Sequence, residues 1–82
     1  MAQKSETKDR EYEVFATCLR MCRAKADLSQ NDLAKLIGVH EQSITNWETG
    51  DYMPSLKVTV RLADALGVSI DQLVGREPIA VG

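Results

Sequence analysis

The sequence predicts an all-α protein built from five short helices. Glycines follow apolar segments at Gly38, Gly50, Gly67 and Gly75, where a glycine ends a helix by taking a left-handed conformation. No stretch of useful length alternates apolar and polar residues with a period of two, so we expect no β-strands. A chain of 82 residues has room for one hydrophobic core.

The helix boundaries follow from capping residues. We expect the first helix from about residue 11 to residue 26, and the third from residue 40 or 41 to residue 48. Ser29, Ser55 and Ser69 are expected to begin the second, fourth and fifth helices. A serine hydroxyl accepts a hydrogen bond from a backbone N–H that the first helical turn leaves free.

Apolar residues recur at helical spacing in each segment, and we expect one stripe from each helix to form the core. The stripes are Phe15, Leu19, Cys22 and Ala26; Leu33, Leu36 and Ile37; Ile44 and Trp47; Leu56, Val60, Ala63 and Leu66; and Ile70, Leu73 and Val74. None of these helices is long enough to be stable alone, so they must pack on one another.

The folded domain is expected over residues 11–75. Residues 1–10 are polar and charged after the first two positions, and we expect a disordered tail there. Residues 76–82 are expected to form a second tail, with an apolar patch from Ile79 to Val81.

Composition argues against several classes of protein. No segment approaches the roughly 18 apolar residues of a membrane span, and no basic stretch precedes an apolar core as in a secretory signal; we therefore expect a cytoplasmic protein. Cys18 and Cys22 are poorly aimed for a disulfide and too few for zinc, with His40 far along the chain. We expect no metal, no other cofactor, no small-molecule ligand and no enzymatic activity, because no catalytic set or phosphate loop is present.

The most informative segment is residues 28–50. It predicts two helices joined by a tight turn at residues 38–40, with Gly38 in the left-handed conformation and Ala34 small enough for the helices to cross closely. Ile44 and Trp47 are expected to hold the second of these helices on the core. Two helices locked at a steep angle, with one face of the second left free, make a helix-turn-helix.

The free face of that second helix carries short polar side chains that suit base edges. Gln and Asn can form two hydrogen bonds to adenine, Ser and Thr can bond either type of base, and a Thr methyl can touch the methyl of thymine. We call these residues the reading face: Glu41, Gln42, Ser43, Thr45 and Asn46. An ordinary solvated helix face would favour Lys and Glu instead, although each of these residues taken singly also fits a solvated position.

Short motifs between Leu19 and Gly75 stand in a characteristic order: Leu19-Arg-Met-Cys-Arg23, Leu28-Ser-Gln-Asn-Asp-Leu-Ala34, Gly38-Val39, Ile44-Thr-Asn-Trp-Glu48, Gly50, Pro54-Ser55, Leu62-Ala63, Leu66-Gly-Val-Ser69 and Asp71-Gln-Leu73. With these motifs the chain resembles the Cro/repressor (Xre-type) family of phage and bacterial transcriptional regulators. The resemblance implies a five-helix lambda-repressor-like domain that binds double-stranded DNA in the major groove.

The resemblance also implies individual roles. Gln30 is similar to a residue that contacts a phosphate and supports the reading helix, and Gln42, Ser43, Thr45 and Asn46 fall on base-facing positions. Arg23 and Glu48 match a partly buried salt bridge, which together with Trp47 would brace that helix.

Charge is the main argument against tight DNA binding. The chain carries 10 Lys and Arg against 12 Asp and Glu, a net charge of −2, whereas affinity for DNA depends on neutralised phosphates. Glu41 adds a negative charge to the reading face, though a Glu can accept a hydrogen bond from cytosine, and the loop 51–54 has no Lys or Arg. The candidates for phosphate contact, each equally well a solvated charge, are Arg20, Lys35, Lys57 and Arg61.

The sequence therefore favours a transcriptional regulator, expected to be a repressor that binds a palindromic operator as a homodimer. The fifth helix and the apolar residues Val74, Ile79 and Val81 are candidates for the two-fold contact. The alternative is an antitoxin or protein-interaction module that binds a partner protein as well as DNA, which the acidic balance and the apolar tail would suit.

Overall fold

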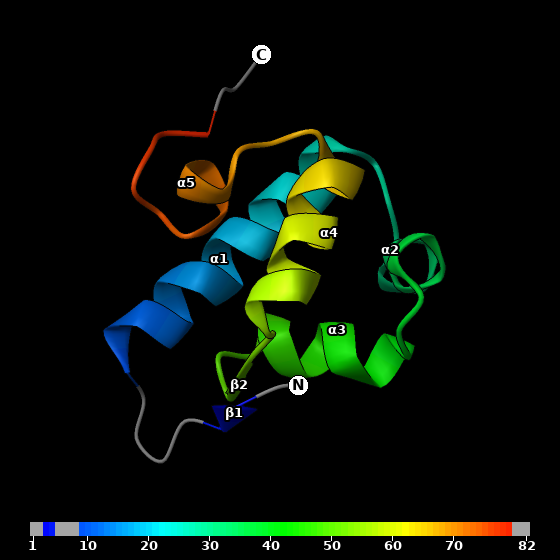
Figure 1. Ribbon diagram of the computed structural model, residues 1–82, viewed down its shortest axis with the longest axis horizontal. Coiled ribbons are helices and arrows are strands. Elements are labelled where there is room, and N and C mark those ends of the chain that lie inside the picture. The colour runs from blue at the N-terminus through cyan, green and yellow to red at the C-terminus, as the bar shows by residue number, and fades with distance from the viewer. Residues whose placement is uncertain (1–2, 5–8, 80–82) are drawn as a thin grey trace.

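The computed structural model describes residues 3–4 and 9–79, and its helices follow the expected order (Figure 1). The helices are α1 Arg10–Lys25, α2 Gln30–Ile37, α3 Glu41–Glu48, α4 Leu56–Leu66 and α5 Ile70–Leu73. Two short strands accompany them, β1 Gln3–Lys4 and β2 Tyr52–Met53. The all-α prediction of five helices is confirmed, with each boundary within one or two residues of the expected position.

The strands correct the expectation that none would form. β1 pairs with β2 in antiparallel register, Gln3 opposite Met53 and Lys4 opposite Tyr52. Residues 3 and 4 belong to the segment that we expected to be a disordered tail, and Arg10, the last residue of that segment, begins α1. The other residues of the tail before position 9 lie outside the described residues. A strand of two residues is too short for any alternation pattern to reveal it.

Serine caps begin three of the helices, as expected. The Ser29 hydroxyl accepts from the backbone N–H of Asp32 at 3.0 Å, and the Asp32 carboxylate accepts from the Ser29 backbone N–H at 3.2 Å. This reciprocal capping box, with the bond from the Ser29 backbone as the larger cause, holds the pKa of Asp32 below its usual value. Ser69 forms the same box with Gln72, and the Ser55 hydroxyl accepts from the Val58 backbone N–H.

The core takes one stripe from each helix, but not every expected residue. Leu36, Leu56, Val60 and Ile70 were expected inside and are 61%, 74%, 40% and 37% exposed. On α4 the buried side chains are Thr59, Leu62, Ala63 and Leu66. Thr59 tolerates burial because its hydroxyl donates to the Ser55 carbonyl at 2.8 Å. The apolar residues of α4 therefore form two rows, and the core uses only one of them.

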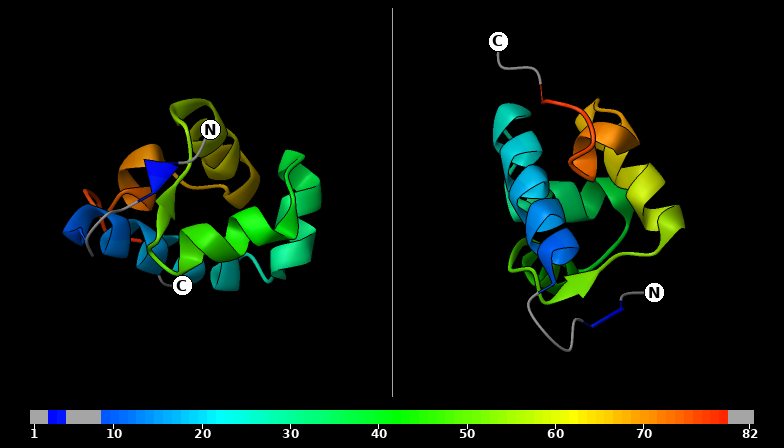
Figure 2. Two further views of the ribbon diagram at one scale, coloured as in Figure 1. Left: turned by 90° about the horizontal axis from the view of Figure 1, so that it is seen from below. Right: turned by 90° about the vertical axis from the view of Figure 1, so that its left-hand side faces the viewer.

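The packing leaves α3 along one edge of the molecule. α3 packs against both α1 and α2, and its buried side chains are Ile44, Trp47 and Glu48. Figure 2 (left) shows α3 running across the underside of the fold, and Figure 2 (right) shows α4 and α5 together on one side of α1. One long side of α3 therefore faces away from the core.

Candidate nucleic-acid interface

The turn between α2 and α3 has the geometry that the sequence predicts. Gly38 ends α2 in the left-handed conformation, with a φ of 75°. The backbone N–H groups of Gly38 and Val39 both donate to the Ala34 carbonyl, at 2.9 and 3.0 Å. The Val39 side chain is half-buried and packs against the core, so the turn fixes the angle at which α3 leaves α2.

A partly buried ion pair holds the C-terminal end of α3. The Arg23 guanidinium donates to both carboxylate oxygens of Glu48, Nε to Oε2 at 2.6 Å and Nη2 to Oε1 at 3.0 Å. Its remaining Nη1 donates to the Leu28 carbonyl at 2.9 Å. Glu48 is only 5% exposed, and its hydrogen bond raises the pKa of Arg23. The pair ties α3 to α1 and to the α1–α2 connection.

Gln30 extends this pair into a chain of four side chains, Arg23, Glu48, Gln30 and Thr45, which we call the brace. The Gln30 Nε2 donates to Glu48 Oε1 at 3.0 Å, and the Gln30 Oε1 accepts from the Thr45 hydroxyl at 2.9 Å. Since a side-chain amide has two N–H donors, one N–H of Gln30 remains available at the surface. The bonds to α3 position Gln30 without exhausting its capacity to bind a phosphate.

Arg20 is exposed on α1 and reaches the C-terminal end of α3, and its predicted phosphate contact stays a prediction. One guanidinium nitrogen of Arg20 donates to the backbone carbonyl of Glu48, and the other donates to the Thr17 hydroxyl at 3.3 Å. A cation on the last carbonyls of a helix satisfies groups that have no partner within the helix. The residue type of Arg20 indicates a possible phosphate contact, but it does not show which partner a long side chain reaches within the fold.

The residues of the reading face differ in how they are held. Glu41 and Gln42 are exposed, and Ser43, Thr45 and Asn46 are half-buried. The Gln42 Nε2 donates to Asn46 Oδ1 at 3.0 Å, which leaves the carbonyl of Gln42 and both N–H groups of Asn46 available for other partners. Thr45 stands at the edge of the face, because its hydroxyl proton is used by Gln30.

Two residues that sequence reasoning missed hold the ends of this face. The Asn31 side chain donates to the Glu41 carboxylate at 3.2 Å and so joins the start of α2 to the start of α3. The Thr49 hydroxyl lies 3.0 Å from the Asn46 carbonyl and 3.1 Å from the Asp51 carboxylate, just after α3. The sequence offered two signals for these contacts. Asn31 is a polar residue in the first turn of α2, and Thr49 is a threonine directly after α3.

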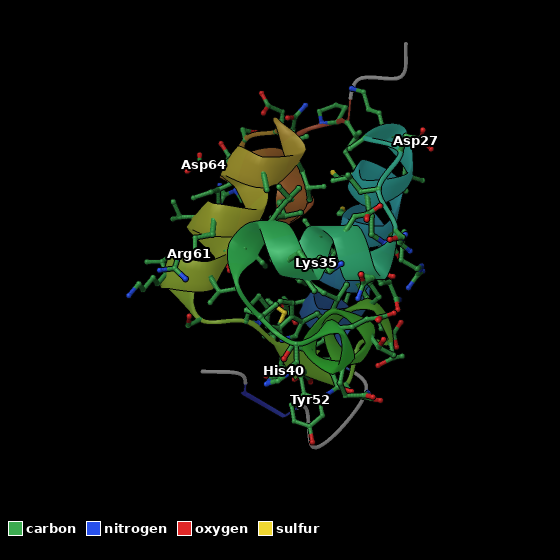
Figure 3. All side chains as sticks on the ribbon, turned by 90° about the vertical axis from the view of Figure 1, so that its right-hand side faces the viewer. Asp27, Lys35, His40, Tyr52, Arg61 and Asp64 are labelled. Carbon is green, nitrogen blue, oxygen red and sulfur yellow. The ribbon has the colours of Figure 1, made fainter. Side chains whose placement is uncertain are left out.

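The remaining candidate cations are exposed and lie on other elements. Lys35 is on α2, and Lys57 and Arg61 are on α4. Figure 3 shows Arg61 and Asp64 projecting from α4 to one side of the molecule, well away from His40 at the start of α3. None of these three side chains hydrogen-bonds to α3 within the described part of the chain, so a phosphate contact by each of them stays a prediction.

Neither cysteine is poised for chemistry. Cys18 is half-buried and Cys22 is buried, both are free thiols, and burial raises the pKa of each. Within the described residues, no cluster of His, Cys, Asp or Glu could hold a metal ion. Over the same residues, no helix has the length and apolar character of a membrane span.

Comparison with known proteins identifies the architecture. The model of the helix-turn-helix family matches residues 19–73. An uncharacterized HTH-type transcriptional regulator of Methanocaldococcus jannaschii is 44% identical over 55 residues, which cover 67% of this chain and 83% of that protein. The cryptic phage CTXphi transcriptional repressor RstR of Vibrio cholerae is 37% identical over 54 residues, 66% of this chain and 48% of the repressor.

Solved structures agree with these relatives. The restriction-modification controller protein C.AhdI of Aeromonas hydrophila superposes with a TM-score of 0.75 at 31% identity, covering 79% of this chain and 98% of the controller. The SOS-response transcriptional repressor LexA from Eubacterium rectale gives a TM-score of 0.80 at 26% identity, covering 93% of this chain and 81% of that one. The chain therefore belongs to the helix-turn-helix family, as a DNA-binding transcriptional regulator of the Cro/repressor type.

Proposed function

We propose that this regulator is a cytoplasmic repressor, without catalytic activity, that binds a palindromic DNA operator as a homodimer. The observation that carries the proposal is the contrast between the two sides of α3. The side toward the core is locked by the brace. The opposite side presents Gln42, Ser43 and Asn46, which are uncharged polar side chains outside the brace, beside the charged Glu41. The repressor names of RstR and of LexA support the regulatory direction.

The proposed contacts divide between base edges and phosphates. With α3 in the major groove, the free carbonyl of Gln42 and the free N–H groups of Asn46 meet base edges, with Ser43 beside them. Thr45 contributes its methyl group, because its hydroxyl is directed to Gln30. A phosphate lies at the start of α2, where the free N–H of Gln30 and the unpaired backbone N–H groups of the first turn point outward.

Selection of binding sites from random duplex DNA tests this proposal. We expect a palindrome whose half-sites lie about one helical turn apart, roughly 34–36 Å. Asn46→Ala and Gln42→Ala should each relax the preference at one base per half-site, by about 1–3 kcal/mol of discrimination. Uniform weakening for all sequences, with the base preference intact, would place base reading elsewhere.

The salt dependence of binding tests the phosphate contacts. With about three phosphates contacted per subunit, the slope of log K against log salt should be near −5 for a dimer. A slope near −10 would mean that the protein neutralises about twice as many phosphates as we propose.

A further inference from the structure

Exposed apolar and charged side chains lie on both sides of α4, on α2 and on α5, away from the proposed base-reading residues of α3. One flank of α4 is an open groove between α2 and α4, lined by Lys35, Leu36, Arg61 and Ala65 among others. Leu36 is 61% exposed on the rim of this groove. With Leu56, Val60 and Ile70 it belongs to a group of exposed apolar side chains on α2, α4 and α5, and such groups are what partner surfaces cover.

The opposite flank carries the complementary chemistry. α5 begins with Ile70, which is 37% exposed, followed by the exposed carboxylate of Asp71. Between the flanks, the outer face of α4 exposes Leu56 and Val60. The α5 edge, with Ile70 and Asp71, is apolar and acidic. The α2–α4 groove on the other side of α4 is apolar and mainly cationic, although Asp64 also lines it, so the two surfaces are complementary.

We propose that a second copy of this chain covers both flanks, with α5 of each copy seated in the α2–α4 groove of the other. Asp71 of one copy then faces Arg61 and Lys35 of its partner, and Ile70 packs beside Leu36. This inference rests on the homodimer of the proposed function and names its contact surface.

The symmetry of a DNA-binding dimer fits this arrangement. In Figure 1, α5 and α2 lie on opposite sides of α4, and α3 crosses near the end where α4 begins. A two-fold axis parallel to α4, in front of it, exchanges the two flanks and keeps both α3 helices at the same end. An axis across α4 would put the two α3 helices at opposite ends, where one duplex cannot meet both.

The C-terminal residues expected at the two-fold contact offer less surface. Val74 and Ile79 are half-buried and already pack against the chain's own core, and Val81 lies outside the described residues. Within the described part of the chain, Lys35, Arg61 and Asp71 make no side-chain ion pair, so their charges are available to a partner. The charge match across the axis favours a second copy over an unrelated protein.

A charge-swap experiment tests the interface without DNA. Sedimentation equilibrium of the 82-residue chain should show a dimer. Arg61→Asp and Asp71→Arg should each raise the dissociation constant of the dimer about tenfold, because each reversal alters two symmetric pairs. The double variant, with the charges exchanged, should return the constant to within about threefold of the original.

Control variants separate the interface from general effects. Glu11→Arg makes the same charge reversal in the first turn of α1 and should leave the dimer unchanged. Leu36→Lys, which changes no pair of charges in the original chain, should also weaken the dimer. Circular dichroism checks that each variant keeps its helices, so that loss of the dimer is not loss of the fold.

Two results would overturn the inference. One is a chain that stays monomeric without DNA at every concentration, and the other is a double variant no better than either single one. A monomer that still selects a palindrome would leave the proposed function standing and remove this interface. A dimer that responds to the charge reversals as expected but selects no DNA sequence would support this interface and contradict the proposed function.

Discussion

The two polar sides of α3 carry similar kinds of residue but use them in different ways. Toward α1 and α2, Glu48 and Thr45 are hydrogen-bonded to side chains of other helices, and Glu48 is buried. On the outer side, Gln42 bonds only to Asn46, one turn along the same helix. The inner bonds fix where α3 sits, whereas the outer one leaves donors and acceptors for another molecule.

Within the eight residues of α3, one side therefore contributes to the stability of the fold and the other is available for the recognition of DNA. A bond between helices that is shielded from water contributes to folding, because breaking it leaves a partly buried partner without its hydrogen bond. An exposed bond within one helix can be exchanged for water or for a base edge at little cost. Substitutions on the inner side should therefore change the free energy of unfolding, and those on the outer side should change DNA preference alone.

The largest effect is expected at Glu48. Glu48→Ala removes the acceptor for Arg23 and Gln30 and leaves the guanidinium partly buried without its partner, so it should lower the free energy of unfolding by about 3 kcal/mol. Urea denaturation measures the change. The matched control is Gln42→Ala, on the exposed side of the same helix and bonded only to Asn46, which should stay within about 0.5 kcal/mol of the original chain. Equal losses for the two variants would contradict the division of α3 into two sides.

A smaller effect is expected at Thr45, where the two sides meet. Thr45→Val keeps the methyl group and replaces the hydroxyl that Gln30 accepts from with a second methyl group, so it should cost about 1 kcal/mol of stability. Thr45→Ser keeps the hydroxyl and removes the methyl, so it should be the more stable variant and should lose preference at the base that the methyl touches. Denaturation and operator selection on both variants separate the two roles. If Val and Ser variants select the same sequences, Thr45 does not read a base.

Local chemistry explains which parts of the fold could be predicted from sequence. Ser29, Ser55 and Ser69 were identified as caps because a cap depends only on its own helix turn. Leu36, Leu56 and Val60 were placed inside because their spacing is helical, but spacing cannot say which of two apolar rows meets the neighbouring helices.

The partners of long side chains are the part of the site that could not be predicted from the sequence. The positions of Gln42, Asn46 and Ser43 on one exposed side of α3 followed from helical periodicity. The partner of Arg20 did not, because a flexible arginine on α1 reaches a carbonyl 28 residues away in sequence. The pairing of residues 3–4 with 52–53 was also invisible, since it depends on how the chain returns after α3.

The smallest effect is expected at Asp32, a carboxylate that is hydrogen-bonded like Glu48 but exposed. Because its pKa in the folded chain lies below its usual value of 3.8, its ionised form stabilises the fold above that value, and the contribution is lost as the pH falls through the lower, folded pKa. The stability difference between the original chain and Asp32→Ala should therefore shrink in acid, when unfolding is followed from neutral pH downward. Leu36→Ala, at an exposed position of the same helix that carries no titratable group, is the control and should show no such change with pH. If the stability that Asp32 contributes at neutral pH were as large as the loss expected for Glu48→Ala, an exposed hydrogen-bonded carboxylate would stabilise the fold as much as a buried one. That result would contradict the importance that we assign to the burial of Glu48.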